Sequence, residues 1–215
     1  MDSSQRQKVS KRLSYQVDRS DDGSAPAALV QAMRQGARAF QRALCEGERL
    51  LLAINPKVGD GECQTPKFAT FVLPDDGVGL AAFTSLTPLE GCFPNHRPIP
   101  LPGKRIALLA ISANALLVVD PPAGIVLPEP ALMALAAGDT WLPPTEDEQL
   151  HNHVRQVCAH FGCHFLRFSA TATGATLLRF EAESKEDATR ACAALGQDQM
   201  VVARCAPLHL IPVLR

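Results

Sequence analysis

The chain has 215 residues, of which 47% are apolar and 20% charged, and its 21 basic side chains nearly balance 22 acidic ones. This composition is typical of a globular protein and excludes a wholly disordered chain. A formal net charge of -1 gives no overall field for nucleic acid or anionic lipid, so we predict neither partner.

The N-terminal segment, the most apolar window and the cysteines together indicate the cellular compartment of the protein. The first 24 residues lack the hydrophobic core of a signal peptide. The most apolar window, residues 106–119, is too short to span a bilayer and contains Ser112 and Asn114. Seven cysteines at irregular spacings favour free thiols over a disulfide framework. We therefore expect a cytoplasmic protein with no membrane partner.

The N-terminal segment, residues 1–23, mixes five Lys or Arg with four Asp and has almost no apolar periodicity. We predict a disordered tail there. Ser24 is a helix-capping candidate, and Pro26 suits the first turn of a helix. Up to Gly47, apolar residues recur at steps of three or four, which predicts one amphipathic helix with this stripe: Leu29, Met33, Ala37, Phe40 and Leu44.

Three apolar segments then predict strands. RLLLAI, residues 49–54, has the nearly continuous apolar character of a buried strand. FATFVL (68–73) and VGLAAF (78–83) are joined by PDDG, whose Asp and Gly residues favour a tight reversal. We therefore expect an antiparallel hairpin after the first strand.

The middle of the chain alternates between helix and strand signals. Thr87 and Glu90 form a capping box, which predicts a helix start. A short buried helix, a strand and a helix closed by Gly138 are then expected from GKRIALLAIS (103–112), ANALLVVD (113–120) and EPALMALAAGD (129–139). The two prolines of WLPPTED, residues 141–147, indicate a domain boundary or a stiff linker.

The last part of the chain predicts the order helix, strand, strand, helix, strand. A second capping box, Thr145 with Glu148, opens the first helix, which Gly162 should end. A further helix is expected from Ser184 to Gly196. The remaining segments are two strands around the turn TATG, a final strand, and an extended tail on an edge or in coil: CHFLRFSA (163–170), ATLLRFEA (175–182), MVVARC (200–205) and PLHLIPVLR (207–215).

These elements predict an α/β (α+β) protein with two small mixed α/β domains, the second of α-β-β-α-β order. The tail occupies residues 1–23, the first domain residues 24–142, and the second domain residues 145–215. Each domain has capped helices and apolar strands, so each is expected to bury a core of its own.

The segment HNHVRQVCAHFGCH, residues 151–164, holds four of the six histidines and two of the seven cysteines. On a helix, His151 and Cys158 would lie on one flank of the apolar stripe, and His153 and His160 on the other. Zinc ligands must converge at about 2.0 to 2.3 Å from the ion. Because these donors diverge, we predict no metal site here.

Other catalytic signals are at chance level. The chain has no Gly-x-Ser-x-Gly elbow, no phosphate-binding loop and no dinucleotide fingerprint. Asp60, Glu62, Asp75 and Asp76 lie in Gly-Asp segments that are typical of solvated turns. We therefore expect no catalytic residue, no cofactor and no enzyme activity.

The order of segments, with the phrases LAAFTS (80–85), VVDPP (118–122) and ALMALAAGD (131–139), resembles the SseB family, the enhanced serine sensitivity proteins of bacteria. Family members have Asn where this chain has Asp120. The resemblance implies a bacterial, cytoplasmic protein with SseB-like N-terminal and C-terminal domains. It also implies a link to serine tolerance and, through the C-terminal domain, to type III secretion. It supplies no catalytic residues.

Two functions remain open. The first is a non-catalytic protein-interaction or regulatory module, which binds an unidentified protein through loops at residues 83–100. The expected surface combines apolar groups with a polar rim: Phe83, Leu86, Leu89, Phe93, His96 and Arg97. The same run also fits a connector whose apolar residues lie under the sheet. The alternative function is an amino acid or nucleotide sensor, or an enzyme, with a pocket between the domains near Asp75, Asp76 or Asp120.

Overall fold

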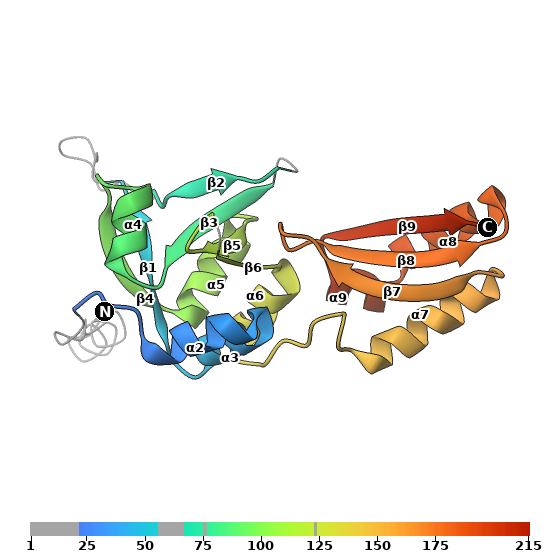
Figure 1. Ribbon diagram of the computed structural model, residues 1–215, viewed down its shortest axis with the longest axis horizontal. Helices are drawn as coiled ribbons and strands as arrows, with labels where there is room; N and C mark the ends of the chain where they lie inside the picture. Colours follow the sequence, from blue (N-terminus) through green and yellow to red (C-terminus); the bar gives the residue numbers. More distant parts are fainter. Residues whose placement is uncertain (1–21, 56–66, 75–76, 123) are drawn as a thin grey trace, which may run out of the picture.

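The computed structural model describes residues 22–55, 67–74, 77–122 and 124–215. It contains two β-sheets, each with helices packed against it (Figure 1). This arrangement confirms the mixed α/β class with two sheet groups. Residues 1–21 of the predicted tail lie outside the described residues, as do Asp60, Glu62, Asp75 and Asp76. No helix within the described ranges is long and apolar enough to cross a membrane.

The first sheet has, within the described residues, six strands in the order β4-β1-β3-β5-β6, with β2 also paired to β3. β3 and β5 are parallel, and the other pairs are antiparallel. The strands are β1 (Arg49–Ile54), β2 (Thr70–Val72), β3 (Val78–Phe83), β4 (Arg97–Pro102), β5 (Leu116–Val119) and β6 (Ile125–Leu127). The helices are α2 (Ala27–Gln35), α3 (Ala37–Cys45), α4 (Leu86–Cys92), α5 (Gly103–Ser112) and α6 (Glu129–Ala137).

Strand β1 is apolar without alternation because both of its faces are covered. Leu50 and Leu52 belong to a core shared with α2, α3, α5 and α6. Leu51 and Ala53 belong to a second core, on the other face, shared with α4. A strand buried on both sides needs a continuous apolar run, as RLLLAI provides. The predicted strand and the predicted hairpin of β2 with β3 are both confirmed.

The single helix predicted after Ser24 is two helices. α2 and α3 meet at Gly36, whose φ of 102° breaks the helical path. Glycine adopts this backbone conformation at low cost, since it has no Cβ. The residue before α2 is Pro26, so the predicted Ser24 cap is wrong. The apolar stripe survives the break, because Leu29 and Phe40 are buried in the same core.

The run at residues 83–100 is not a set of loops. α4 begins at Leu86, so Thr87 lies inside the helix and the predicted capping box is wrong. The run then enters β4, an edge strand antiparallel to β1. Its prolines, Pro98, Pro100 and Pro102, occupy alternate positions. Successive amides of a strand point in opposite directions, so the residues between the prolines can all donate to β1.

The second sheet has, in the described part of the chain, three strands in the order β7-β8-β9. β7 and β8 are antiparallel, and β8 and β9 are parallel. The strands are β7 (His164–Ala170), β8 (Thr176–Ala182) and β9 (Leu208–Leu214). The helices are α7 (Glu148–His160), α8 (Lys185–Gln197) and α9 (Gln199–Cys205), and all three contribute to one core with the sheet.

The segment MVVARC forms most of helix α9 and not the predicted strand, so the second unit has the order α-β-β-α-α-β. The Asp198 carboxylate caps this helix, because it accepts hydrogen bonds from Met200 N and Val201 N at 3.0 Å. Val201 and Cys205, four residues apart, are both buried. Apolar residues at this spacing fit one face of a short helix.

Helix α7 starts later than the sequence predicts. Its N-cap is Asp147, whose Oδ1 accepts from Leu150 N at 3.0 Å, so the predicted capping box of Thr145 and Glu148 is wrong. The predicted stop is confirmed, because Gly162 follows the helix with a φ of 68°. The predicted edge position of the last segment is also confirmed, since β9 lies at the edge of its sheet.

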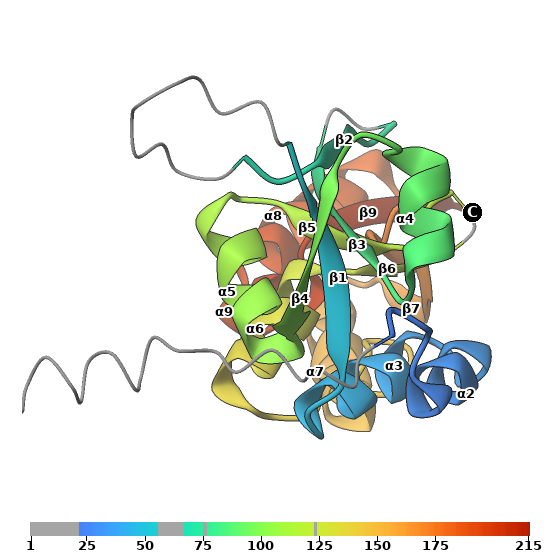
Figure 2. The ribbon, with the colours of Figure 1, turned by 90° about the vertical axis from the view of Figure 1, so that its left-hand side faces the viewer.

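The two sheets have separate cores. The clusters around the first sheet reach Trp141, whereas the cluster around the second begins at Leu150. Figure 2, viewed from the side of the first sheet, shows the second sheet and its helices behind it. That the units are two domains divided near Pro143 stays a prediction, which limited proteolysis tests.

Candidate functional site

The apolar residues of the predicted interaction surface form a small core. Phe83 and Leu89 are 0% and 1% exposed, and Leu86 and Phe93 are half-buried against them. The ring centroid of Phe93 lies 6.0 Å from that of Phe83. The expectation that Phe83 and Leu89 lie on a surface is therefore wrong, and the alternative of apolar residues under the sheet describes them.

The polar rim of that predicted surface is small. His96 is half-buried, with its ring centroid 5.0 Å from that of Phe93. Its Nδ1 is buried without a hydrogen-bond partner in the described part of the chain. Arg97 begins β4 and is exposed. The structure thus brings His96 to the α4 core and leaves Arg97 as the exposed member of the six.

Asp120 connects the ends of the parallel strands β3 and β5. Its Oδ1 accepts from Thr84 N at 2.9 Å, and its Oδ2 accepts from Thr84 Oγ1 at 2.6 Å. Asp75 and Asp76 lie outside the described residues. Because Thr84 occupies both oxygens of Asp120, this carboxylate holds two strands together.

The histidines of residues 151–164 have separate partners. His151 Nε2 donates to Pro144 O at 2.7 Å, and His153 Nε2 lies 2.7 Å from Asp198 Oδ2. Cys158 is fully buried in the second core. Among the described residues, no group of three His, Cys, Asp or Glu side chains is placed to hold a metal ion.

Two cysteines of the second core are chemically suppressed. Burial raises the pKa of Cys158 to about 12, with the nearby thiols of Cys163 and Cys192 adding to the effect. Burial also raises the pKa of Cys205 to about 12. A thiol must lose its proton to act as a nucleophile, so these two cysteines are structural.

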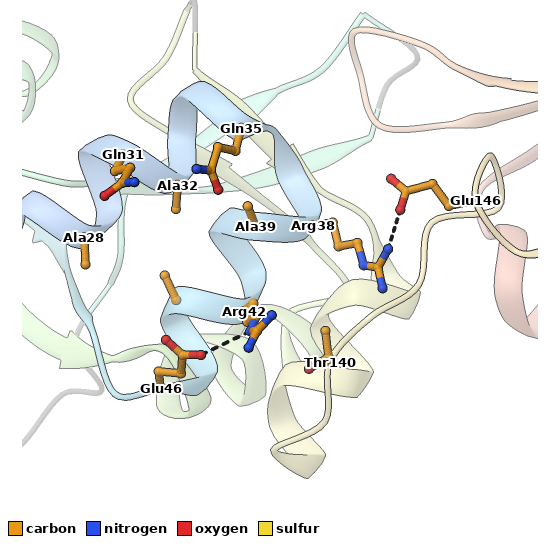
Figure 3. A pocket seen from close by; sticks show the side chains of 11 residues that line it. Ala28, Gln31, Ala32, Gln35, Arg38, Ala39, Arg42, Glu46, Thr140 and Glu146 are labelled. Carbon is orange, nitrogen blue, oxygen red and sulfur yellow. Dashed lines mark hydrogen bonds and ion pairs between the residues drawn. The ribbon is translucent and has the colours of Figure 1, made fainter.

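Two open grooves lie on either side of the segment that connects the sheets. The first, the α2–α3 groove, has a volume of about 610 Å³ (Figure 3). In Figure 3 its arginines turn to neighbouring carboxylates: Arg38 to Glu146, and Arg42 to Glu46. The rest of the lining is small or polar: Ala28, Gln31, Ala32, Gln35, Ala39, Ala43 and Thr140.

The second, the α6–α9 groove, has a volume of about 710 Å³ and is more apolar. Met133 and Leu142, which line it, are 54% and 39% exposed. Its other lining residues come from α6, the connecting segment, the start of α7, and α9: Pro130, Ala134, Thr140, Trp141, Glu146, Asp147, Glu148, Gln149, Ala203 and Arg204. Thr140 and Glu146 line both grooves. The connecting segment, residues 138–147, therefore lies between the two grooves, and we call it the ridge.

Buried Gln41 fixes this ridge to α3. Its Nε2 donates to Asp139 O at 2.8 Å, and its Oε1 accepts from Trp141 N at 3.1 Å. The Cys45 thiol also donates to Asp139 O at 3.2 Å. Since Gln41 is 0% exposed, these bonds satisfy buried polar groups and hold the segment in one conformation.

An ion pair fixes the far end of the ridge to α9. Arg204 Nη1 donates to Asp147 Oδ2 at 2.6 Å, and Arg204 Nη2 donates to Gln149 Oε1 at 3.1 Å. Asp147 is 3% exposed, and its other oxygen caps α7. The same carboxylate therefore links the start of α7 to α9, and Arg204 is already paired.

Trp141 has an unused donor. The side chain is half-buried in the α6–α9 groove, and its Nε1 is buried without an acceptor in the described ranges. Buried indole N–H groups usually find a partner. The two prolines of WLPPTED predict a domain boundary or a stiff linker, although the tryptophan and leucine beside them are a signal of packing or binding.

Comparison with known protein families matches residues 26–134 to the SseB protein N-terminal domain. The match covers about half of the 215 residues, from the start of α2 into α6. The ridge and the second sheet lie beyond it. No curated protein and no solved structure matches this chain. The chain belongs to the SseB family.

Proposed function

We propose that this chain is a non-catalytic protein-interaction or regulatory module, and that a partner protein binds the α6–α9 groove. The observation that carries the proposal is the exposure of Met133 and Leu142 beside the unpartnered indole N–H of Trp141. Methionine adapts its shape to different partners, and tryptophan is enriched where interfaces are tightest.

Most charged side chains of the two grooves are paired with each other, which supports binding without catalysis. Arg38 pairs with Glu146, and Arg204 with Asp147. A general acid, base or nucleophile needs a group that is free to act on a substrate. Groups that are already paired with each other position the ridge instead.

The alternative is a small-molecule sensor or enzyme that takes an amino acid or nucleotide in the same groove. The observation in its favour is the volume of about 710 Å³, which lies within the range of ligand pockets. Against this candidate, the carboxylates that were expected to converge there include Asp120, which Thr84 holds elsewhere.

The family suggests a setting for this activity. Through the family resemblance, we propose that the module acts in the bacterial cytoplasm and serves serine tolerance or type III secretion. The matched domain provides α2, α3 and part of α6. The α6–α9 groove is also formed by the ridge and α9, which lie outside the matched domain. A partner that binds this groove would therefore require the full chain.

The experiment is affinity capture from bacterial lysate with the full chain, a Met133→Asp variant and a Leu108→Asp variant. Leu108 on α5 is a matched control, because it is 52% exposed and Met133 is 54% exposed. We expect a partner that is retained by Leu108→Asp and lost with Met133→Asp. A thermal-shift screen of amino acids and nucleotides runs beside it. If no protein is captured reproducibly and one metabolite raises the melting temperature of the chain, the interaction module is wrong and the small-molecule sensor or enzyme is favoured.

A further inference from the structure

The second sheet has one covered and one open face. Alternate residues of β8 are buried: Thr176, Leu178, Phe180 and Ala182. The last three belong to the core with α7, α8 and α9. The residues between them are half-buried on the opposite side: Leu177, Arg179 and Glu181. In Figure 1, α8 and α9 lie behind this sheet, and no labelled helix lies in front of it.

The strand register assigns the neighbours of Arg179 on this open face. Arg167 of β7 lies directly opposite Arg179, and Ile211 of β9 lies opposite it on the other side. Leu177 pairs with His209 in the same way, and Glu181 with Val213. We call these outward-facing residues the basic sheet face: Arg167, Leu177, Arg179, Glu181, His209, Ile211 and Val213.

Arg167 and Arg179 carry two positive charges that no neighbouring carboxylate neutralises in the described part of the chain. Like charges directly opposite each other destabilise a sheet. In the described part of the chain neither Arg167 nor Arg179 has an ion-pair partner, and Arg179 Nε is buried without a hydrogen-bond acceptor. The acid on this face, Glu181, is already paired with Arg215. Electrostatic stabilisation of the sheet does not explain two facing arginines, because their charges repel each other.

We propose that the basic sheet face binds an acidic segment of a partner polypeptide. The two guanidinium groups would receive its carboxylates, because arginine pairs with carboxylate through two parallel hydrogen bonds. The aliphatic side chains of Leu177, Ile211 and Val213 lie beside them and would cover apolar residues of the same segment. This surface is separate from the α6–α9 groove, so the proposal does not depend on the groove.

The side chains of the face favour a polypeptide over single-stranded nucleic acid. Sheets that bind nucleic acid stack bases on exposed aromatic rings. The basic sheet face has no Phe, Tyr or Trp, because Phe165, Phe168 and Phe180 are turned into the core. Aliphatic residues around a charge pair are the surface that an acidic and apolar segment fits.

The test is fluorescence anisotropy of the full chain with labelled peptides of about ten residues that alternate Glu and Val, Gln and Val, or Lys and Val. A single-stranded oligothymidylate is the nucleic acid probe. We expect binding of the Glu–Val peptide alone, weakened at high salt. Arg167→Glu should weaken it by about tenfold or more. The same variant should melt at an equal or higher temperature, because it replaces repulsion of Arg179 with attraction.

The matched control is Arg34→Glu, which makes the same charge change at an exposed position of α2 in the first unit. It should leave peptide affinity within about twofold. Four results would overturn the proposal: no binding of the Glu–Val peptide, unchanged binding in Arg167→Glu, equal loss in Arg34→Glu, or tighter binding of the oligothymidylate than of the Glu–Val peptide.

Discussion

The backbone amide of Trp141 donates to the side chain of Gln41 across 100 residues of sequence, at 3.1 Å. The other end of the same side chain donates to Asp139 O at 2.8 Å. The side-chain amide of Gln41 thus pairs with one backbone carbonyl and one backbone N–H of the ridge. The position of the ridge, and with it the shape of the α6–α9 groove, depends on this residue.

We predict that Gln41→Leu lowers the free energy of unfolding by about 1 to 3 kcal/mol, because it leaves the Trp141 amide unpaired and leaves Asp139 O with the weaker Cys45 thiol as its donor. The ridge should also become the first site of limited proteolysis, near Pro143. Gln31→Leu, on the exposed side of α2, is the control and should change little. Urea denaturation measures the first effect. Equal stability of the two variants would show that the Gln41 bonds do not hold the ridge.

Asp120→Asn should be tolerated and Asp120→Ala should not. Asp120 has a φ of 47°, a conformation that Asn adopts more readily than Ala. Asn can still accept from Thr84 N, whereas Ala loses both bonds to Thr84. We expect a loss of at most about 1 kcal/mol for Asn and about 2 to 4 kcal/mol for Ala by urea denaturation. The family resemblance places Asn here, and an Asn variant as unstable as Ala would contradict this account.

Acid should weaken the second unit through Asp198. Burial alone would raise the pKa of this carboxyl, but hydrogen bonds from Val201 N, His153 and Met200 N outweigh burial and lower it. A lowered pKa in the folded state gives stability that is present above the unfolded value of about 4 and is lost as pH falls through the folded pKa.

Asp198→Asn should therefore be less stable than the parent chain near pH 6, because Asn keeps the cap but loses the charge that the bonds from Val201 N, His153 and Met200 N stabilise. The two chains should be equally stable near pH 2 to 3. Melting curves over this pH range measure the convergence. Glu186→Gln, an exposed acid-to-amide change in α8, is the control. A constant difference between Asp198→Asn and the parent at all pH values would mean that ionisation of Asp198 does not stabilise the fold.

Alkylation should separate the cysteines into two groups. Cys92 is exposed, whereas burial raises the pKa of Cys158 and Cys205 to about 12. A short pulse of iodoacetamide near pH 8 should modify Cys92 and leave the two buried thiols unmodified until the chain is unfolded in urea. Peptide mass spectrometry reads the result. Modification of Cys158 or Cys205 in the native protein at the rate of Cys92 would contradict their burial.

The sequence predicts those elements whose apolar pattern has one reading. RLLLAI, GKRIALLAIS and EPALMALAAGD are a strand and two helices, as expected. MVVARC is predicted as a strand because it has two adjacent valines, but a short apolar run fits either structure, and here it is a helix. The Asp198 side chain favours the helix, because it caps the first turn by accepting hydrogen bonds from Met200 N and Val201 N.

The candidate site was harder to predict because it depends on contacts across the chain. The bond of Gln41 to Trp141 spans 100 residues, and that of Arg204 to Asp147 spans 57. No local pattern encodes such pairs. The predicted exposure of Phe83 and Leu89 is wrong for a related reason: the Pro-rich run does not show that α4 packs Leu89 against Phe83.

Trp141 offers the most direct measurement of the proposed binding site, because it is the single tryptophan of the chain and lines the α6–α9 groove. Protein labelled with 5-fluorotryptophan should give one fluorine resonance in the NMR spectrum. We predict that this resonance shifts on addition of the captured partner, and that it stays unchanged with amino acids and nucleotides and with the partner after Met133→Asp. If the chemical shift of this resonance is unchanged by the partner but changes on addition of one metabolite, the result would contradict the interaction module.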